Sequence, residues 1–264
     1  MVKLIILGAG EGKRLRPLTK DIPKCMVKIF DKSLLEHQLD VLKKCGISDI
    51  VIVTGYCRDK IKVPNVKYYE NKFFDSTNMV ETLFCAEKEI EGEVIVSYGD
   101  IIYERDVLNK LLSSKSDFSI VVDKNWKPYW ESRFTNILDD AESLTIENDL
   151  ITSIGQKVNS VSQIQGQYIG LMKFQNNATN ILKNFYHSAK MKSKNFPNPL
   201  NPNVSYENSY MTDLLQGLIN QGHRLIPVEI NNGWLELDTL EDLKIYQKMY
   251  KTKTLNKFIN LENL

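Results

Sequence analysis

The chain has 264 residues, and its hydrophobic content of 42% is enough for one large α/β domain. Its 34 basic and 33 acidic residues leave a formal net charge of +1, which excludes an overall field that would hold nucleic acid or an anionic membrane. The apolar run at residues 4–7 is too short for a signal peptide, and no segment has the length of a membrane span. We therefore expect a cytoplasmic protein with no nucleic-acid or membrane partner.

The first half of the chain alternates apolar runs with helix signals. Residues 2–7 form an apolar run that stops at Gly8, which predicts a strand buried on both faces. Ser33 and Glu36 make a capping box before a helix that ends at Gly46. Further strands are predicted at 50–53, 94–96 and 118–122, and further helices from Asn78 to residue 92 and at 104–113. This alternation predicts a Rossmann-like, doubly wound, mostly parallel sheet.

The pattern changes after Asp123. Short alternating strands around the Asn148-Asp149 turn, and another run at 168–174, predict a small antiparallel insertion at about 124–174, over one end of the sheet. A helix at 180–189, a proline-containing loop, a helix at 214–219, a strand at 225–230 and a segment at 234–238 follow, and Thr239 and Asp242 cap a last helix. We expect one domain over residues 1–250 and a C-terminal tail at 251–264.

A glycine-rich loop with several cations follows the first strand. Gly8, Gly10 and Gly12 allow sharp turns that expose backbone N–H groups. A Walker A loop would need Ser or Thr where Arg14 stands, and a dinucleotide fingerprint would need a third glycine in place of Lys13. The loop therefore predicts a polyphosphate site, the alternative being a glycine turn with a solvated basic face. Four cations of the segment are expected within reach of that ligand: Lys13, Arg14, Arg16 and Lys24.

Two aspartates far apart in the chain follow predicted strands. Asp100 comes after the strand at 94–96, and Asp238 comes after the segment that begins at Trp234. Ligands of open parallel sheets bind beyond the carboxyl ends of the strands, so we expect both carboxylates beside the glycine loop. Each aspartate alone could be a turn or helix cap, but two carboxylates with a triphosphate are a typical magnesium site. The cysteines and histidines show no metal-ligand spacing.

Several motifs together resemble a known family. The glycine loop with its Pro23-Lys24 pair, Tyr98-Gly-Asp100, Tyr210-Met-Thr-Asp213 and Trp234-Leu-Glu-Leu-Asp238 are similar to the phosphocholine and 2-aminoethylphosphonate cytidylyltransferase branch of the CTP-dependent nucleotidyltransferases. The resemblance covers most of residues 1–250. With Gly166-Gln-Tyr-Ile-Gly170 included, the pattern is most similar to the phosphoglutamine cytidylyltransferases of bacterial capsule phosphoramidate synthesis.

The resemblance implies an activity and a set of site residues. CMP would pass from CTP to a small phosphorylated acceptor with release of pyrophosphate, the acceptor being L-glutamine phosphate, which gives CDP-L-glutamine, or phosphocholine or 2-aminoethylphosphonate. Lys24 and Arg14 would be catalytic, and Asp100 and Asp238, assisted by Glu236, would bind Mg²⁺ or Mn²⁺. The implied nucleotide-binding residues are Leu7, Gly8, Ala9, Gly10, Gly12, Asn71, Asn78, Thr82 and Tyr98. Met79 departs from the phosphocholine enzyme, which has a second Asn at that position.

Aromatic residues and one arginine follow the strand that ends at Asp123. Aromatic faces hold a quaternary ammonium, an arginine binds a carboxylate or phosphate, and an aspartate pairs with an ammonium. The same rings could instead seal the insertion against the core, and the sequence does not choose between a choline and an amino-acid acceptor. The expected acceptor-binding residues are Asp123, Trp126, Tyr129, Trp130 and Arg133.

The absence of a catalytic histidine agrees with this chemistry. A phosphate monoester has a second pKa near ~6, so the acceptor is already a nucleophile at neutral pH. Two alternatives remain at this point. A hexose-1-phosphate nucleotidyltransferase would share the N-terminal signature, although the short chain and the tryptophan-rich insertion count against it. A non-catalytic nucleotide-binding regulatory subunit would be free to lose Lys24 or one acidic residue, and this chain has kept them.

Overall fold

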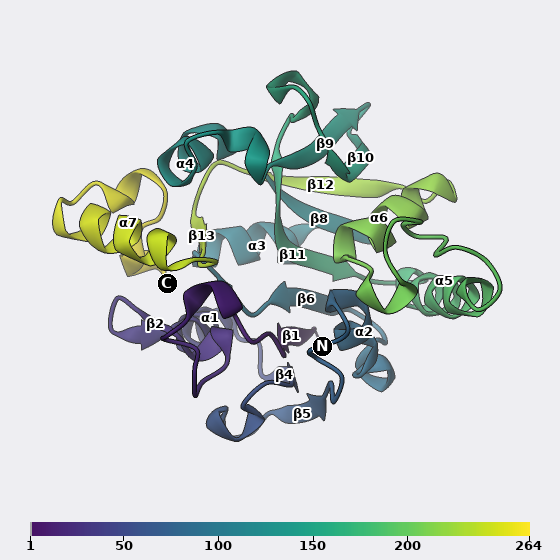
Figure 1. Ribbon diagram of the computed structural model, residues 1–264, viewed down its shortest axis with the longest axis horizontal. Coiled ribbons are helices and arrows are strands. Elements are labelled where there is room, and N and C mark those ends of the chain that lie inside the picture. Colours follow the sequence, from purple (N-terminus) through teal and green to yellow (C-terminus); the bar gives the residue numbers. More distant parts are fainter. Residues whose placement is uncertain (1) are drawn as a thin grey trace.

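A seven-stranded sheet forms the centre of the computed structural model, which describes residues 2–264 (Figure 1). The strand order is β12-β8-β11-β6-β1-β4-β5. Neighbouring strands are parallel, except that β11 runs antiparallel to both β6 and β8. The strands are β1 (Lys3–Gly8), β4 (Asp49–Thr54), β5 (Lys67–Glu70), β6 (Val94–Tyr98), β8 (Phe118–Asp123), β11 (Gln167–Phe174) and β12 (Leu225–Ile230).

Helices cover both faces of this sheet. Leu4 and Ile6 of β1 face one apolar cluster, shared with α1 (Leu34–Lys44), α3 (Arg105–Ser113), α4 (Trp126–Arg133) and α7 (Leu240–Lys251). Ile5 and Leu7 face the other, shared with α2 (Met79–Phe84), α5 (Ala178–Ser193) and α6 (Met211–Asn220). Because β1 is buried on both faces, it reads as a continuous apolar run, and the predicted doubly wound arrangement is confirmed. No helix among the described residues has the length and hydropathy needed to cross a bilayer.

Three two-stranded sheets complete the fold. β2 (Lys28–Ile29) pairs with β3 (Lys32–Ser33), and β7 (Ile101–Tyr103) pairs with β13 (Trp234–Glu236). β9 (Glu142–Glu147) and β10 (Leu150–Lys157) form a hairpin that stands beyond the β12 edge of the main sheet (Figure 1). Its turn residues Asn148 and Asp149 have φ of 50° and 60°, the left-handed conformation that their residue types predict.

The predicted helix caps are confirmed at two sites. Ser33 and Glu36 form the capping box of α1, and Thr239 and Asp242 form that of α7. The helix predicted from Asn78 ends earlier than expected, at Phe84, and a 3-10 turn at Glu87–Glu89 follows it. The other short 3-10 segments are Lys13–Leu15, Lys24–Met26, Arg58–Lys60, Ile137–Asp139, Val161–Gln163, Tyr206–Asn208, Leu255–Lys257 and Leu261–Asn263.

The segment expected to form an insertion is built differently. The run at 168–174 belongs to β11, which lies inside the main sheet between β6 and β8 rather than above it. The aromatic stretch before the hairpin forms helix α4, an element that the sequence analysis did not predict. Its buried residues, Trp126, Tyr129, Trp130 and Arg133, have the i, i+3, i+4, i+7 spacing of one helix face. That spacing explains why the aromatic residues turn inward together.

Candidate active site

Pairing between β7 and β13 brings the two distant aspartates together. Ile101 lies opposite Glu236 in this antiparallel pair, and the Leu237 N–H donates to the Asp100 carbonyl oxygen at 3.0 Å. Asp100 and Asp238 therefore flank the same end of a short ladder. Asp100 and Asp238 were expected to lie together. A two-stranded sheet that the sequence pattern did not reveal brings them there.

A buried glutamine holds the turn that carries Asp100. The Gln38 Nε2 donates to the carbonyl oxygens of Tyr98 and Ile101, both at 2.8 Å, and its Oε1 accepts from the Ser97 hydroxyl at 2.9 Å. Gly99 packs against the end of β1, where an added Cβ would lie 2.6 Å from the Leu7 carbonyl oxygen. Only glycine permits this approach, so the turn places Asp100 directly beside the glycine loop. Gln38 was missed in the sequence, although a polar residue on the apolar side of a helix is a usable signal.

The glycine loop folds back on itself and positions Lys24. Gly12 has φ of +67°. The Thr19 hydroxyl closes the turn by donating to the Gly12 carbonyl oxygen at 2.8 Å. The Lys24 N–H donates to the Gly10 carbonyl oxygen at 3.1 Å. An added Cβ on Gly12 would lie 3.0 Å from the Lys24 Cβ, so the two residues are packed against each other. The loop therefore fixes the base of the Lys24 side chain.

Lys24 lies between the two aspartates. Its Nζ is 2.6 Å from Asp100 Oδ2 and is also hydrogen-bonded to Asp238 Oδ1, and Arg14 reaches Asp238 Oδ1 at 3.2 Å. Burial alone would lower the pKa of Lys24, but the charges of Asp100 and Asp238 raise it above its usual range. Burial alone would raise the pKa of Asp238, yet Lys24 and Arg14 lower it to about 2. Both groups are therefore charged at neutral pH.

Glu236 completes a cluster of three carboxylates. Asp100, Glu236 and Asp238 each present an oxygen within 4.8 Å of the others. Burial and the charge of Asp238 raise the pKa of Glu236 to about 8, because a third negative charge is disfavoured there. Among the described residues, none forms a hydrogen bond with the buried Asp100 Oδ1. Hard carboxylate oxygens, one of them unused, fit a divalent cation such as Mg²⁺.

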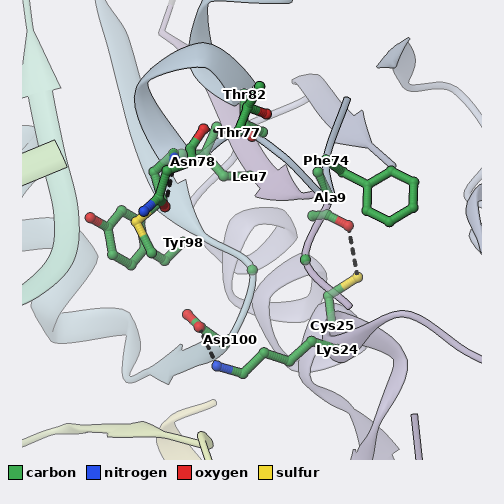
Figure 2. A pocket seen from close by; sticks show the side chains of 14 residues that line it. Leu7, Ala9, Lys24, Cys25, Phe74, Thr77, Asn78, Thr82, Tyr98 and Asp100 are labelled. Atoms are coloured by element: carbon green, nitrogen blue, oxygen red, sulfur yellow. Dashed lines mark hydrogen bonds and ion pairs between the residues drawn. The ribbon is translucent and has the colours of Figure 1, made fainter. Parts of the chain in front are cut away.

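A first cavity of about 220 Å³ lies against the glycine loop (Figure 2). Lys24 extends toward Asp100 at one end of it, and Asn78, Thr77 and Thr82 lie at the other. Phe74, Thr77 and Met79 also line it, although none was predicted to bind. The predicted nucleotide-binding residues that line this cavity are Leu7, Gly8, Ala9, Gly10, Asn78, Thr82 and Tyr98.

Two predicted nucleotide-binding residues do not line the cavity. Gly12 shapes the loop behind Lys24, as described above. Asn71 is 2% exposed, and its Nδ2 donates to the hydroxyl oxygens of Thr77 and Thr82, both at 2.9 Å. Its amide oxygen accepts from the Phe73 N–H. Asn71 therefore orders two threonines that face the cavity, and we do not propose it as a direct nucleotide contact.

A second cavity of about 240 Å³ lies on the other side of the carboxylate cluster. Arg14, Glu236 and Asp238 line it, together with Trp130 from the predicted acceptor set. Met79 and Tyr98 line both cavities. Several polar residues of this cavity were not predicted to bind, although two of the motifs quoted above contain some of them. These polar residues are Asp140, Glu142, Gln167, Tyr168, Tyr210 and Thr212.

The structure places Asp123, Trp126 and Tyr129 in the protein interior. Asp123 is fully buried, and its carboxylate accepts from the N–H groups of Asn125 and Asn232 and from the Trp234 indole N–H at 2.8 Å. Trp126 is 3% exposed and lines neither of the two cavities. We therefore do not propose Asp123 or Trp126 as acceptor ligands, because their polar atoms and ring faces are used in packing.

Tyr129 and Arg133 support the carboxylate cluster from behind. The Tyr129 hydroxyl accepts from the Glu236 N–H at 2.9 Å. The Arg133 guanidinium, whose side chain is fully buried, bonds to both oxygens of Asp242 at 2.9 and 3.2 Å and to Glu236 Oε2 at 3.0 Å. Asp242 in turn accepts from the Asp238 N–H. These contacts hold Glu236 and Asp238 in place, and so we interpret Arg133 as a positioning residue rather than an acceptor ligand.

Replacing Arg133 with methionine should destabilise the fold by about 3–5 kcal/mol, because it leaves the buried Asp242 carboxylate without its cation. Urea unfolding measures this loss. Lys127→Met, on the exposed side of the same helix, is the matched control and should change the free energy of unfolding by less than about 0.5 kcal/mol. An Arg133→Met protein of unchanged stability with a raised KM for acceptor would instead make Arg133 a direct acceptor ligand.

Comparison with known proteins identifies the family. The model of the MobA-like NTP transferase domain matches residues 4–159. The chain is 40% identical over 252 residues to CTP:phosphoglutamine cytidylyltransferase of Campylobacter jejuni. This match covers 91% of this chain and 97% of that protein. It is 32% identical over 118 residues to choline-phosphate cytidylyltransferase of Streptococcus pneumoniae, covering 43% of this chain and 51% of that protein.

Solved structures share the fold. The CTP:phosphocholine cytidylyltransferase from Streptococcus pneumoniae matches with a TM-score of 0.69 at 20% identity, over 96% of this chain and 99% of that one. The inositol-1-phosphate CTP transferase from T. maritima also matches with a TM-score of 0.69, at 21% identity, over 98% and 97% of the two chains. Together with the sequence matches, these findings show that the chain belongs to the family of MobA-like NTP transferase domains and is a nucleotidyltransferase of the cytidylyltransferase branch.

Proposed function

We propose that this protein transfers CMP from CTP to a small phosphorylated acceptor and releases pyrophosphate, with L-glutamine phosphate as acceptor and CDP-L-glutamine as product. One observation supports this above all others: the cluster of Lys24, Asp100 and Asp238 lies where the two cavities meet. Asp100 lines the first cavity and Asp238 the second, while Met79 and Tyr98 line both. A nucleotide in the first cavity and an acceptor in the second would bring their phosphates together at this cluster.

The reaction needs charge neutralisation more than proton transfer. The acceptor phosphate is a dianion at neutral pH and needs no general base. Each pair of like charges ~4 Å apart costs roughly 4 kcal/mol at an effective dielectric constant of ~20. Lys24 would offset this repulsion at the α-phosphate. Arg14, which pairs with Asp238 and whose side chain is 63% exposed, would clamp the β- and γ-phosphates. The same two cations would stabilise the in-line transition state and the departing pyrophosphate.

A divalent cation fits the three carboxylates. Asp100 and Asp238 would hold Mg²⁺, or Mn²⁺ in its place, and Glu236 would assist directly or through a water molecule. When bound, the ion supplies Lewis-acid charge neutralisation for the triphosphate. Gly8 and Gly10 line the first cavity, and their backbone N–H groups would bind phosphate oxygens there.

The acceptor is chosen on similarity. The relative from Campylobacter jejuni, which matches along nearly its whole length, carries phosphoglutamine in its name. We place the product in capsule polysaccharide biosynthesis, as a precursor for phosphoramidate modification, and the enzyme in the cytoplasm, where CTP is made. Phosphocholine and 2-aminoethylphosphonate are the alternative acceptors. The similarity to the choline-phosphate cytidylyltransferase of Streptococcus pneumoniae is the reason to assay them.

Pyrophosphate release with each of the four nucleoside triphosphates, paired with a panel of acceptors, tests the proposal. The panel contains phosphoglutamine, phosphocholine, 2-aminoethylphosphonate and glucose 1-phosphate. We expect release with CTP and the highest kcat/KM with phosphoglutamine. Release with UTP or dTTP and glucose 1-phosphate would identify a hexose-1-phosphate nucleotidyltransferase instead. No release with any pair would favour a non-catalytic nucleotide-binding subunit.

A further inference from the structure

Acidic side chains outnumber basic ones in the lining of the second cavity. Asp140, Glu142, Glu236 and Asp238 line it, against the single cation Arg14. Arg14 already pairs with Asp238. Glu142, at the start of β9, differs from Asp238 in having no such cation, because the charges that act on it are those of Asp140 and Asp213, both negative. Burial and these two charges raise the pKa of Glu142 to about 7. A cation bound beside Glu142 would stabilise the ionised form of this carboxyl, so the position favours a positively charged ligand group.

A second, independent observation points to a ligand in the same cavity. Gln167, at the start of β11, is 8% exposed, and its Oε1 is buried without a hydrogen-bond partner among residues 2–264. Trp130, 2% exposed, lies beside it with its indole N–H toward the Asp140 carboxylate. Both residues line the second cavity. An unpaired buried polar atom is unfavourable, and a ligand of matching chemistry would supply the hydrogen bond that it lacks.

The chemistry of these atoms selects the kind of cation. A carboxylate attracts any ammonium, but the Gln167 Oε1 needs an N–H donor, which a quaternary ammonium does not have. A primary ammonium supplies such donors, and it is the cationic group of an α-amino acid.

We infer that Glu142 and Gln167 bind the primary ammonium group of the acceptor and thereby select an amino-acid phosphate over a choline phosphate. This inference rests on the proposed function, because it takes the second cavity to be the acceptor site. It replaces Asp123, the acid expected to meet the ammonium, with two residues that line the cavity and are free to bind.

Binding of three related acceptors, measured by calorimetry without turnover, tests the inference. They are phosphoglutamine, its analogue without the α-amino group, and its analogue with a trimethylated α-amino group. Each is titrated with and without a CTP analogue that cannot react, because a methylene group bridges its α- and β-phosphorus atoms. The protein should bind phosphoglutamine roughly 10²- to 10⁴-fold more tightly than either analogue, because a site built for N–H donors rejects ligands that lack them.

Two variants assign this preference to residues. Glu142→Gln and Gln167→Leu should each weaken phosphoglutamine binding about 10-fold or more and leave the affinity for the des-amino analogue unchanged. Gln167→Leu should also reduce the discrimination against the trimethylated analogue. Glu147→Gln, at the exposed end of the same strand β9, is the matched control and should change none of these affinities. The melting temperature and CTP-analogue affinity of each variant report whether the fold and the first cavity are intact.

The outcomes separate this inference from the proposed function. Tight, ammonium-dependent binding with no pyrophosphate release from CTP would support the inference and overturn the proposed function. Pyrophosphate release with equal affinity for all three acceptors would support the proposed function and overturn the inference. Equal weakening of the amino and des-amino ligands by Glu142→Gln, or no binding of any of the three, would also overturn the inference.

Discussion

Replacing Lys24 with alanine should lower the turnover number about 10²- to 10³-fold while the fold survives. The side chain is held between Asp100 and Asp238, and it is the buried cation at the junction of the two cavities. Without it, the α-phosphate would lose the cation that we propose offsets its developing charge. Steady-state pyrophosphate release with CTP and phosphoglutamine measures the loss, and circular dichroism checks the fold.

Lys20→Ala provides the matched control for this change. Lys20 lies in the same loop, but its side chain is exposed. Its loss should change turnover less than about twofold, since exposed charges contribute little. Turnover of the Lys24→Ala protein within a few fold of the unmodified enzyme would remove Lys24 from the mechanism.

Asp238→Asn should lower turnover by at least about 10²-fold and raise the Mg²⁺ concentration needed for half-maximal activity. The substitution removes the carboxylate that joins Lys24, Arg14 and the three-acid cluster. Activity measured as a function of Mg²⁺ concentration separates the two effects. Adding Mn²⁺ in place of Mg²⁺ shows whether the remaining ligands still accept a divalent ion.

Glu241→Gln is the control for Asp238→Asn, because Glu241 is an exposed acid in the first turn of the neighbouring helix α7. It should leave the Mg²⁺ dependence unchanged. An Asp238→Asn enzyme with normal turnover and normal Mg²⁺ dependence would show that Asp238 is not a metal ligand and that the carboxylate cluster has a structural role.

The glycine loop and the two aspartates could be predicted because their chemistry is local in sequence. Gly8, Gly10 and Lys24 lie within one short segment, and parallel strands deliver their carboxyl ends to one edge of a sheet. Asp100 follows the parallel strand β6, Asp238 follows β13 of a separate antiparallel pair, and the structure brings both to Lys24. Their exact neighbours depend on the β7–β13 pairing, which joins residues more than a hundred positions apart, and no local pattern encodes that register.

The acceptor side could not be read from the sequence in the same way. Trp126, Tyr129 and Arg133 attracted a functional interpretation because of their residue types, but their spacing is that of a buried helix face. Glu142 and Gln167 reach the second cavity only because β11 enters the main sheet in the antiparallel direction, with the β9–β10 hairpin beside it. A buried antiparallel strand and one in a separate hairpin have similar apolar patterns, so the sequence does not distinguish them.

The central claim is that the acceptor phosphate attacks the α-phosphorus of CTP at the Lys24, Asp100 and Asp238 cluster. Phosphoglutamine labelled with ¹⁸O in its phosphate group, followed by mass spectrometry of both products, tests this most directly. The account predicts that all of the label stays in CDP-L-glutamine and that the pyrophosphate is unlabelled. Release of free CMP with the label in a triphosphorylated acceptor would place the attack at the β-phosphorus and would contradict the account.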